Sequence, residues 1–176
     1  MGKNLAMVLT IEPLLHQNEK NLLIGHVGMI LGKYDFAQES YLKSSEPLNA
    51  LDMRCDIQDW FVASSLTKSI APEQEPFISK RLATQTESQG NYTEALKQFE
   101  KSVINNEVKN FDKTTIDKHN VECFAGIART SVKLGDIQRG FNISRDIKNK
   151  SLLTDIAVVC ENMKQYLEAA QLYDKA

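Results

Sequence analysis

The pattern that organises this chain is clearest in the stretch Gly90-Asn91-Tyr92-Thr93-Glu94-Ala95-Leu96-Lys97-Gln98-Phe99. Counted from Gly90, an aromatic residue follows after two positions, a small residue after five and a second aromatic residue after nine. Another small residue, Ala83, lies seven positions before the glycine. Small side chains let two helices approach closely, and glycine reaches positive φ at little cost in the turn between them. The stretch therefore predicts two antiparallel helices, with the aromatic residues filling the groove toward the next pair.

The same spacing recurs elsewhere in the sequence. Gly32 and Gly135 begin two further copies, the second one weaker, and Lys164 takes the place of the glycine in a third. A degenerate pair has Ala63 as its small residue but Leu51 at the partner position, so we expect that pair of helices to lie farther apart. The small residues that we expect to pack the paired helices are Gly25, Ala37, Ala63, Ala83, Ala95, Ala128, Gly140, Ala157 and Ala169.

Two helices per unit at a recurrent period are typical of a solenoid of the tetratricopeptide type. The apolar patterns recur near 3.6 residues rather than 2, so the sequence predicts an all-α chain without a sheet. A chain of 176 residues has room for about five such hairpins, and we expect them to form a right-handed superhelix.

The expected organisation is a short N-terminal segment followed by one long helical segment. Residues 1–20 predict a short helix or the end of a preceding repeat, and residues 21–176 predict the solenoid. Ala95 and Gly140 are 45 residues apart, whereas the other consecutive small residues of the second helices are 26 to 32 apart. We therefore place a polar insertion at residues 105–118, as a long loop or a weakly ordered helix extension before a helix that starts near residue 121.

The sequence ends inside the second helix of the last hairpin. We expect an apolar end face there, near Tyr166, Leu172 and Tyr173. Because each repeat of a solenoid contacts only its neighbours, such a face predicts a piece of a longer solenoid that self-associates when it is isolated.

Composition excludes several classes of protein. The chain has 21 basic and 23 acidic residues and a net charge of −2, which argues against a nucleic-acid-binding protein. Cys55, Cys123 and Cys160 are an odd number without paired spacing, so we expect inert thiols in a reducing compartment. The longest apolar run, residues 22–31, is too short to span a bilayer, and we predict neither membrane insertion nor a signal peptide.

Two groups of residues carry side chains of the kind that bind metal ions. His119 and Cys123 are four positions apart and form at most half of a zinc site. Three aspartates, Asp52, Asp56 and Asp59, surround Arg54 without the turn glycine of a calcium loop, which favours a solvated helix end or a salt-bridged turn.

Two other groups have simpler structural explanations. The glycines near Lys33 do not have the spacing of a phosphate-binding loop. His26 lies in an apolar helix, where we expect a hydrogen-bonded packing histidine. We predict no catalytic residue, no cofactor and no metal, and the sequence offers no positive reason to expect an enzyme.

A peptide-binding module is the alternative to a scaffold. Tetratricopeptide domains that bind peptides hold a terminal carboxylate with basic and asparagine residues of successive first helices. The matching positions lie ten and six residues before each turn, and only Lys80 and Arg129 are basic there, with no asparagine. The sequence therefore favours a scaffold over a peptide-binding adaptor.

Several strings are more specific than a generic repeat. One of them is Pro76-Phe77-Ile78-Ser79-Lys80, and the complete set covers residues 21–26, 50–60, 71–80, 135–140 and 161–166. Together they resemble the tetratricopeptide-like part of the intraflagellar transport protein 144 family, also called the WD repeat-containing protein 19 family. The resemblance runs over residues 21–176 and is looser in the insertion at residues 105–118.

The resemblance implies a function that spacing alone does not. Members of that family carry WD-repeat propellers before a long helical solenoid. They are subunits of intraflagellar transport complex A, which serves retrograde transport and the import of membrane cargo into cilia. The resemblance thus implies a scaffold that contacts other propeller–solenoid subunits, reaches membrane cargo only indirectly, and is found in the cilium, at the ciliary base and in the cytoplasm. No catalytic residue comes with the family.

Overall fold

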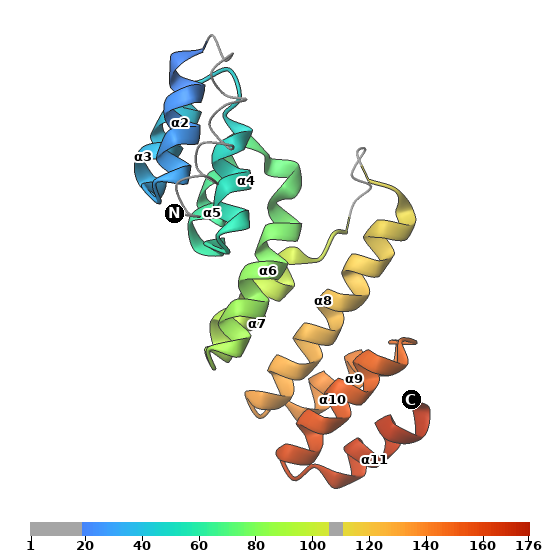
Figure 1. The fold of residues 1–176 in the computed structure, drawn as a ribbon. Coiled ribbons are helices and arrows are strands. Elements are labelled where there is room, and N and C mark those ends of the chain that lie inside the picture. Colours follow the sequence, from blue (N-terminus) through green and yellow to red (C-terminus); the bar gives the residue numbers. More distant parts are fainter. Residues whose placement is uncertain (1–18, 106–110) are drawn as a thin grey trace, which may run out of the picture. The chain divides into compact units, whose positions relative to one another are not determined.

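The computed structural model describes residues 19–105 and 111–176, and in these stretches all regular secondary structure is helical (Figure 1). The all-α prediction is therefore confirmed for the described part of the chain. The short helix expected within residues 1–20 and the centre of the expected insertion, residues 106–110, lie outside the described residues. The chain divides into two compact units, Met1–Pro72 and Glu73–Ala176, and each is described by itself.

The described part of the first unit, from residue 19 on, contains two helical hairpins. Its helices are α2 (Lys20–Ile30), α3 (Tyr34–Leu42), α4 (Leu48–Asp56) and α5 (Trp60–Ile70), followed by the 3₁₀ turn η2 (Pro72–Gln74). Helix α3 packs against both α2 and α4. The pair α4 and α5 makes less extensive contact than the other hairpins, in line with the wider pair expected from Leu51. Pro47 immediately precedes α4, where its missing N–H leaves no donor without a partner.

The second unit contains three helical hairpins. Its helices are α6 (Glu75–Ser88), α7 (Tyr92–Ser102), α8 (Lys113–Lys133), α9 (Ile137–Ser144), α10 (Lys150–Asn162) and α11 (Tyr166–Lys175). Each helix packs against its hairpin partner, and successive hairpins meet where α8 contacts α6, α7 and α10. One buried apolar cluster lies between α6, α7 and α8, and a larger one lies between α8, α10 and α11. Helix α8 is thus the element that joins the two cores.

Every hairpin turn contains one residue in the left-handed region of the backbone map. These residues are Gly32 at φ 71°, Gln58 at 59°, Gly90 at 82°, Gly135 at 90° and Lys164 at 61°. Lys164 therefore adopts the backbone conformation of the glycine that it replaces. Gln58 does the same in the degenerate hairpin, five residues before Ala63, so the turn persists where the sequence signal for it is lost.

Side-chain caps start several of the helices. Asp136 accepts a hydrogen bond from the Arg139 N–H at 3.2 Å, as its position predicts. Asn91 accepts from the Glu94 N–H at 3.3 Å. This is one of the two hydrogen bonds of a capping box, and the Glu94 carboxylate itself accepts from the Gln98 side chain at 2.8 Å.

The start of α8 differs from the expectation. The helix begins at Lys113, eight residues before the predicted start near residue 121. Asp112 accounts for the difference, because its carboxylate accepts hydrogen bonds from the N–H and the hydroxyl of Thr115 at 3.0 and 2.6 Å. The first turns of α8 are polar, so periodicity did not reveal them. The second half of the insertion is thus a capped extension of α8.

Candidate protein-interaction site

The nine small residues that the sequence singled out are all buried. Close helix approach is most direct in the α8/α9 hairpin, where a Cβ added to Gly140 would lie 2.7 Å from the Ala128 carbonyl oxygen. In the first hairpin it is Gly28 that lies opposite Ala37, since an added Cβ would be 3.1 Å from the alanine Cβ. Gly25, one turn earlier, lies under the ring of Tyr41 instead. Gly28 lies three residues after Gly25 on the same face of α2, and this second small residue was the sequence signal for the contact with Ala37.

Sequence reasoning missed one further glycine. Gly126 lies in the middle of α8, and a Cβ added there would be 2.5 Å from the Phe99 ring on α7. Phe99 is only 2% exposed. Hairpin packing did not require a glycine at this position, so its role becomes visible only in the contact between successive hairpins.

The two basic residues of the hypothetical peptide clamp are both paired with carboxylates of a neighbouring helix. Lys80 on α6 lies 2.6 Å from the Glu122 carboxylate on α8. Arg129 on α8 donates through Nε and a terminal nitrogen to the two oxygens of Glu87 on α6, at 3.0 and 2.9 Å. These side chains therefore join two helices of the second unit.

The buried Arg54 side chain makes several polar contacts in the first unit. Its guanidinium donates to Gln38 at 2.8 Å and pairs with Asp35 at 2.5 Å and Asp59 at 3.0 Å. Asp59 also caps α5 by accepting from the Val62 N–H. The salt-bridged turn expected around Arg54 is thus confirmed for Asp59.

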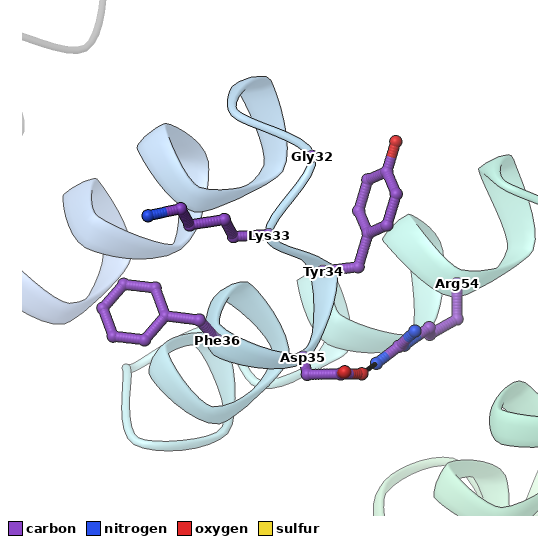
Figure 2. A pocket seen from close by; sticks show the side chains of 6 residues that line it. All are labelled: Gly32, Lys33, Tyr34, Asp35, Phe36 and Arg54. Atoms are coloured by element: carbon purple, nitrogen blue, oxygen red, sulfur yellow. Dashed lines mark hydrogen bonds and ion pairs between the residues drawn. The ribbon is translucent and has the colours of Figure 1, made fainter.

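A shallow depression surrounds the turn between α2 and α3. It is lined by Gly32, Lys33, Tyr34, Asp35, Phe36 and Arg54. Figure 2 shows Lys33 and Phe36 pointing to one side of the turn, and the Asp35–Arg54 ion pair at the other end. Gly25 and Gly28 lie inside the packed hairpin, so the glycines near Lys33 do not belong to one loop.

The sequence-predicted pair His119 and Cys123 lies inside the second unit. The His119 Nε2 is 2.8 Å from the Ser102 carbonyl oxygen and 3.4 Å from the Cys123 sulfur. Burial lowers the pKa of His119 and raises the pKa of Cys123. Among the residues that the structure describes, no third histidine, cysteine or acidic residue completes a group able to hold a metal ion. The pair therefore packs α8 against the end of α7.

The other histidine considered above also has a packing role. His26 Nδ1 lies 2.9 Å from the Tyr41 hydroxyl, and the two rings meet edge to face. This confirms the hydrogen-bonded packing histidine that was expected. Burial raises the pKa of Tyr41 to about 12, so its hydroxyl stays protonated.

The expectation of an apolar face on the last hairpin is partly correct. Tyr166 and Tyr173 are exposed, and so is Leu167. Leu172 is buried, which corrects the expectation, because its side chain joins the cluster between α8, α10 and α11. None of the helices in the described part of the chain combines the length and the apolar character needed to cross a membrane.

Comparison with known proteins gives a consistent set of relatives, although no protein-family model matches. The human protein named WD repeat-containing protein 19 is 41% identical over 98% of this chain. The mouse protein of the same name is 39% identical over 98%, and the Caenorhabditis elegans protein named WD repeat-containing protein dyf-2 is 38% identical over 96%. The chain spans 12% of the length of each of these relatives.

A solved structure supports the fold alone. The crystal structure of MamA aligns with a TM-score of 0.51 at 13% identity, over 86% of this chain and 91% of that one. Its likeness agrees with the prediction of a tetratricopeptide-like helical-hairpin fold. Because the match to the curated relatives covers nearly all of this chain and 12% of theirs, the chain is homologous to one segment of the proteins of the WD repeat-containing protein 19 family.

Proposed function

We propose that this chain is a non-enzymatic scaffold segment of a subunit of intraflagellar transport complex A. Its partners are other propeller–solenoid subunits of that complex, and it reaches ciliary membrane cargo only through them. The segment serves retrograde transport and the import of membrane cargo into cilia, and the protein is found in the cilium, at the ciliary base and in the cytoplasm. Homology to a segment of WD repeat-containing protein 19 and the helical-hairpin fold support this proposal.

The ion pairs between α6 and α8 are the observation that favours a scaffold over a peptide-binding module. A carboxylate clamp needs cations that face a groove and are free to bind the end of a peptide. The Arg129 and Glu87 side chains are only 19% and 10% exposed, and their bidentate pair satisfies both groups. A peptide carboxylate would have to displace Glu87 and leave it buried without a partner, at a cost on the order of 3 kcal/mol. Recognition by shape and dispersed polar contacts is therefore favoured.

Double variants that exchange the charges of an ion pair distinguish a scaffold from a peptide-binding module. Lys80→Glu combined with Glu122→Lys, and Arg129→Glu combined with Glu87→Arg, keep each ion pair but reverse the charge at the clamp positions. The full-length protein carrying both swaps should still co-purify the other complex A subunits from ciliated cells. The matched control is Arg129→Glu alone, which places two carboxylates together and should lower the melting temperature. Loss of every partner by a swapped protein that melts normally would instead support the peptide-binding alternative.

Cross-linking of the assembled complex tests the scaffold directly. Lys97 and Lys150 are exposed in this chain. We expect cross-links from these lysines to other subunits of the complex when the full-length protein is assembled. Cross-links that stay within this chain alone would contradict a scaffold role for the segment.

A further inference from the structure

The chain that leaves α7 is held on α8 by three neighbouring side chains of that helix. The His119 Nε2 lies 2.8 Å from the Ser102 carbonyl oxygen, and the Ser102 hydroxyl lies 3.0 Å from the Cys123 sulfur. Asn120 accepts a hydrogen bond from the Ile104 N–H and donates one to the Ile104 carbonyl oxygen, both at 2.9 Å. The end of α7 is therefore fixed by side chains of α8.

The same histidine packs the start of α8 against α6. The centroid of its ring lies 4.5 Å from that of Phe77, and the Phe77 ring lies 4.7 Å from that of Phe111, which directly precedes the capping Asp112. Most residues of the first turns of α8 are polar and exposed, namely Lys113, Thr114, Thr115, Asp117 and Lys118. A short polar helix is marginal without tertiary packing, so these turns depend on the contacts of His119 and the two phenylalanines.

The surroundings of His119 favour its neutral form. Because the Ser102 carbonyl oxygen can only accept a hydrogen bond, the neutral ring carries its hydrogen on Nε2. The other nitrogen, Nδ1, has no hydrogen-bond partner among the residues that the structure describes. His119 is only 3% exposed, so a second proton would place a charged N–H in a buried site, which costs free energy.

The neighbouring charges do not offset this cost. In the described part of the chain, Lys80 faces His119 from α6 and Glu122 faces it from α8, and the two form an ion pair with an N–O distance of 2.6 Å. Helix α7 contributes the Ser102 carbonyl oxygen, and burial raises the pKa of the Cys123 thiol, which stays neutral. Burial is the largest effect on His119 and lowers its pKa below the usual value of 6.5.

We propose that His119 is an acid-sensitive latch on the start of α8. When His119 binds a second proton, its ring leaves the buried site for solvent, and the first turns of α8 and residues 102–104 detach with it. The rest of the second unit stays folded, because later turns of α8 contribute Ala125, Ile127 and Ala128 to its buried apolar clusters. This inference does not rest on the ciliary function, and its test uses the present chain alone.

Proton linkage gives the direction and the size of the effect. The open form binds a proton with the ordinary histidine pKa of about 6.5, and the closed form binds it more weakly. Opening is therefore independent of pH above about pH 6.5 and increases as the pH falls below that value. Between pH 7.5 and pH 5.5 the equilibrium constant for opening should rise by at most about tenfold.

Hydrogen exchange of the full chain at these two pH values, in low concentrations of urea, tests the latch. The reporter amides are those of Ile104, Lys118 and His119, and the reference amides are those of Ile156 and Ala157 on α10. The reporters should be less protected than the reference amides and insensitive to urea, because a local opening exposes little surface.

The protection factors of the reporters, taken relative to an unfolded peptide at the same pH, should fall by about three- to tenfold at pH 5.5. Unchanged protection of the reporters would overturn the proposal. One common protection factor and one common urea dependence for reporter and reference amides would overturn it as well, since the start of α8 would then open only with the whole unit.

Two variants and a titration assign the effect to His119. His119→Gln keeps a donor near the Ser102 carbonyl and does not titrate, so reporter protection should no longer change between the two pH values. His26→Gln is the matched control, because it removes a histidine of the first unit and should leave the effect intact. In the parent chain, the nuclear magnetic resonance signals of the His119 ring should titrate below pH 6.5. A pH effect that persists in His119→Gln or disappears in His26→Gln overturns the proposal, and so does a His119 ring that titrates at or above pH 6.5.

Discussion

At the scale of single residues, the hairpin turns keep the same backbone conformation even where the turn residue is not a glycine. Lys164 and Gln58 hold φ near +60° although neither is a glycine. The left-handed region costs an L-residue roughly 1–2 kcal/mol. The neighbouring helices must therefore stabilise these turns enough to hold both residues in that conformation.

Replacing Lys164 by glycine should relieve this cost. We expect Lys164→Gly to raise the free energy of unfolding by ~0.5–1 kcal/mol, because glycine reaches positive φ without a steric penalty but loses more chain entropy on folding. Urea denaturation followed by circular dichroism measures the change. Lys164→Ala is the matched control, since it removes the same side chain without easing the backbone. A gain with alanine equal to that with glycine would locate the effect in the side chain instead.

Burial of His119 predicts a pH dependence of stability. Burial lowers the folded-state pKa of His119 below its usual value of 6.5, although the Ser102 carbonyl opposes this shift. Lys80 on α6 also lowers the pKa, and Glu122 on α8 raises it. Below about pH 6.5 the unfolded chain binds a proton that the folded chain resists, so the free energy of unfolding should fall as the pH drops from 6.5 toward the folded-state pKa. Above pH 6.5 His119 contributes no pH dependence.

Denaturant midpoints measured at pH 7.5 and pH 5.5 test this prediction. His119→Gln is the matched control, because glutamine keeps a donor near Ser102 and does not titrate. The loss of stability between the two pH values should be smaller in the variant than in the parent chain. An equal loss in both proteins would assign the pH dependence to other groups.

At the scale of elements, the hairpin α6/α7 is organised by a close approach of its two helices. Ala83 on α6 and Ala95 on α7 are fully buried in the same apolar cluster, next to Phe99. A methyl group is the largest side chain that such an approach accommodates without separating the helices.

Overpacking should therefore destabilise this hairpin. We expect Ala95→Leu or Ala83→Leu to lower the free energy of unfolding by ~1–3 kcal/mol, because the larger side chain forces α6 and α7 apart. Thermal denaturation of the purified chain measures the loss. Thr84→Leu adds a leucine at an exposed position next to Ala83 and should change stability little. Unchanged midpoints for the alanine variants would mean that these positions tolerate a wider approach.

At the scale of the whole molecule, the second compact unit contains two buried apolar clusters of its own. Their members come from helices α6, α7, α8, α10 and α11 and from Ile147 in the loop between α9 and α10, all within residues 73–176. Stability in a repeat fold is approximately a sum over repeats and their nearest-neighbour interfaces. The second unit therefore has the interfaces that it needs within its own residues.

We expect residues 73–176 to fold as an isolated chain. Its far-ultraviolet circular dichroism should be helical, and its urea transition should be cooperative. A matched variant with Phe99→Ala should lose about 3–5 kcal/mol, since it opens a cavity between α7 and α8. A non-cooperative transition in the unmodified piece would show that the second unit depends on the first.

Local spacing was sufficient to predict the hairpins, because a turn and two small residues about a dozen positions apart are contacts within one short stretch. The apolar helix around His26 also predicted its packing role. The early start of α8 was missed because a capping aspartate, rather than an apolar stripe, begins that helix.

The contacts between hairpins were decided only by the tertiary structure. Gly126 meets Phe99, and Arg129 pairs with Glu87, across 27 and 42 positions of sequence. Such pairs depend on how two already formed hairpins stack, which is set by the summed shapes of many side chains. No periodicity within one helix encodes that register. The sequence by itself therefore determined the repeating unit, and only the packed structure determined how one unit recognises the next.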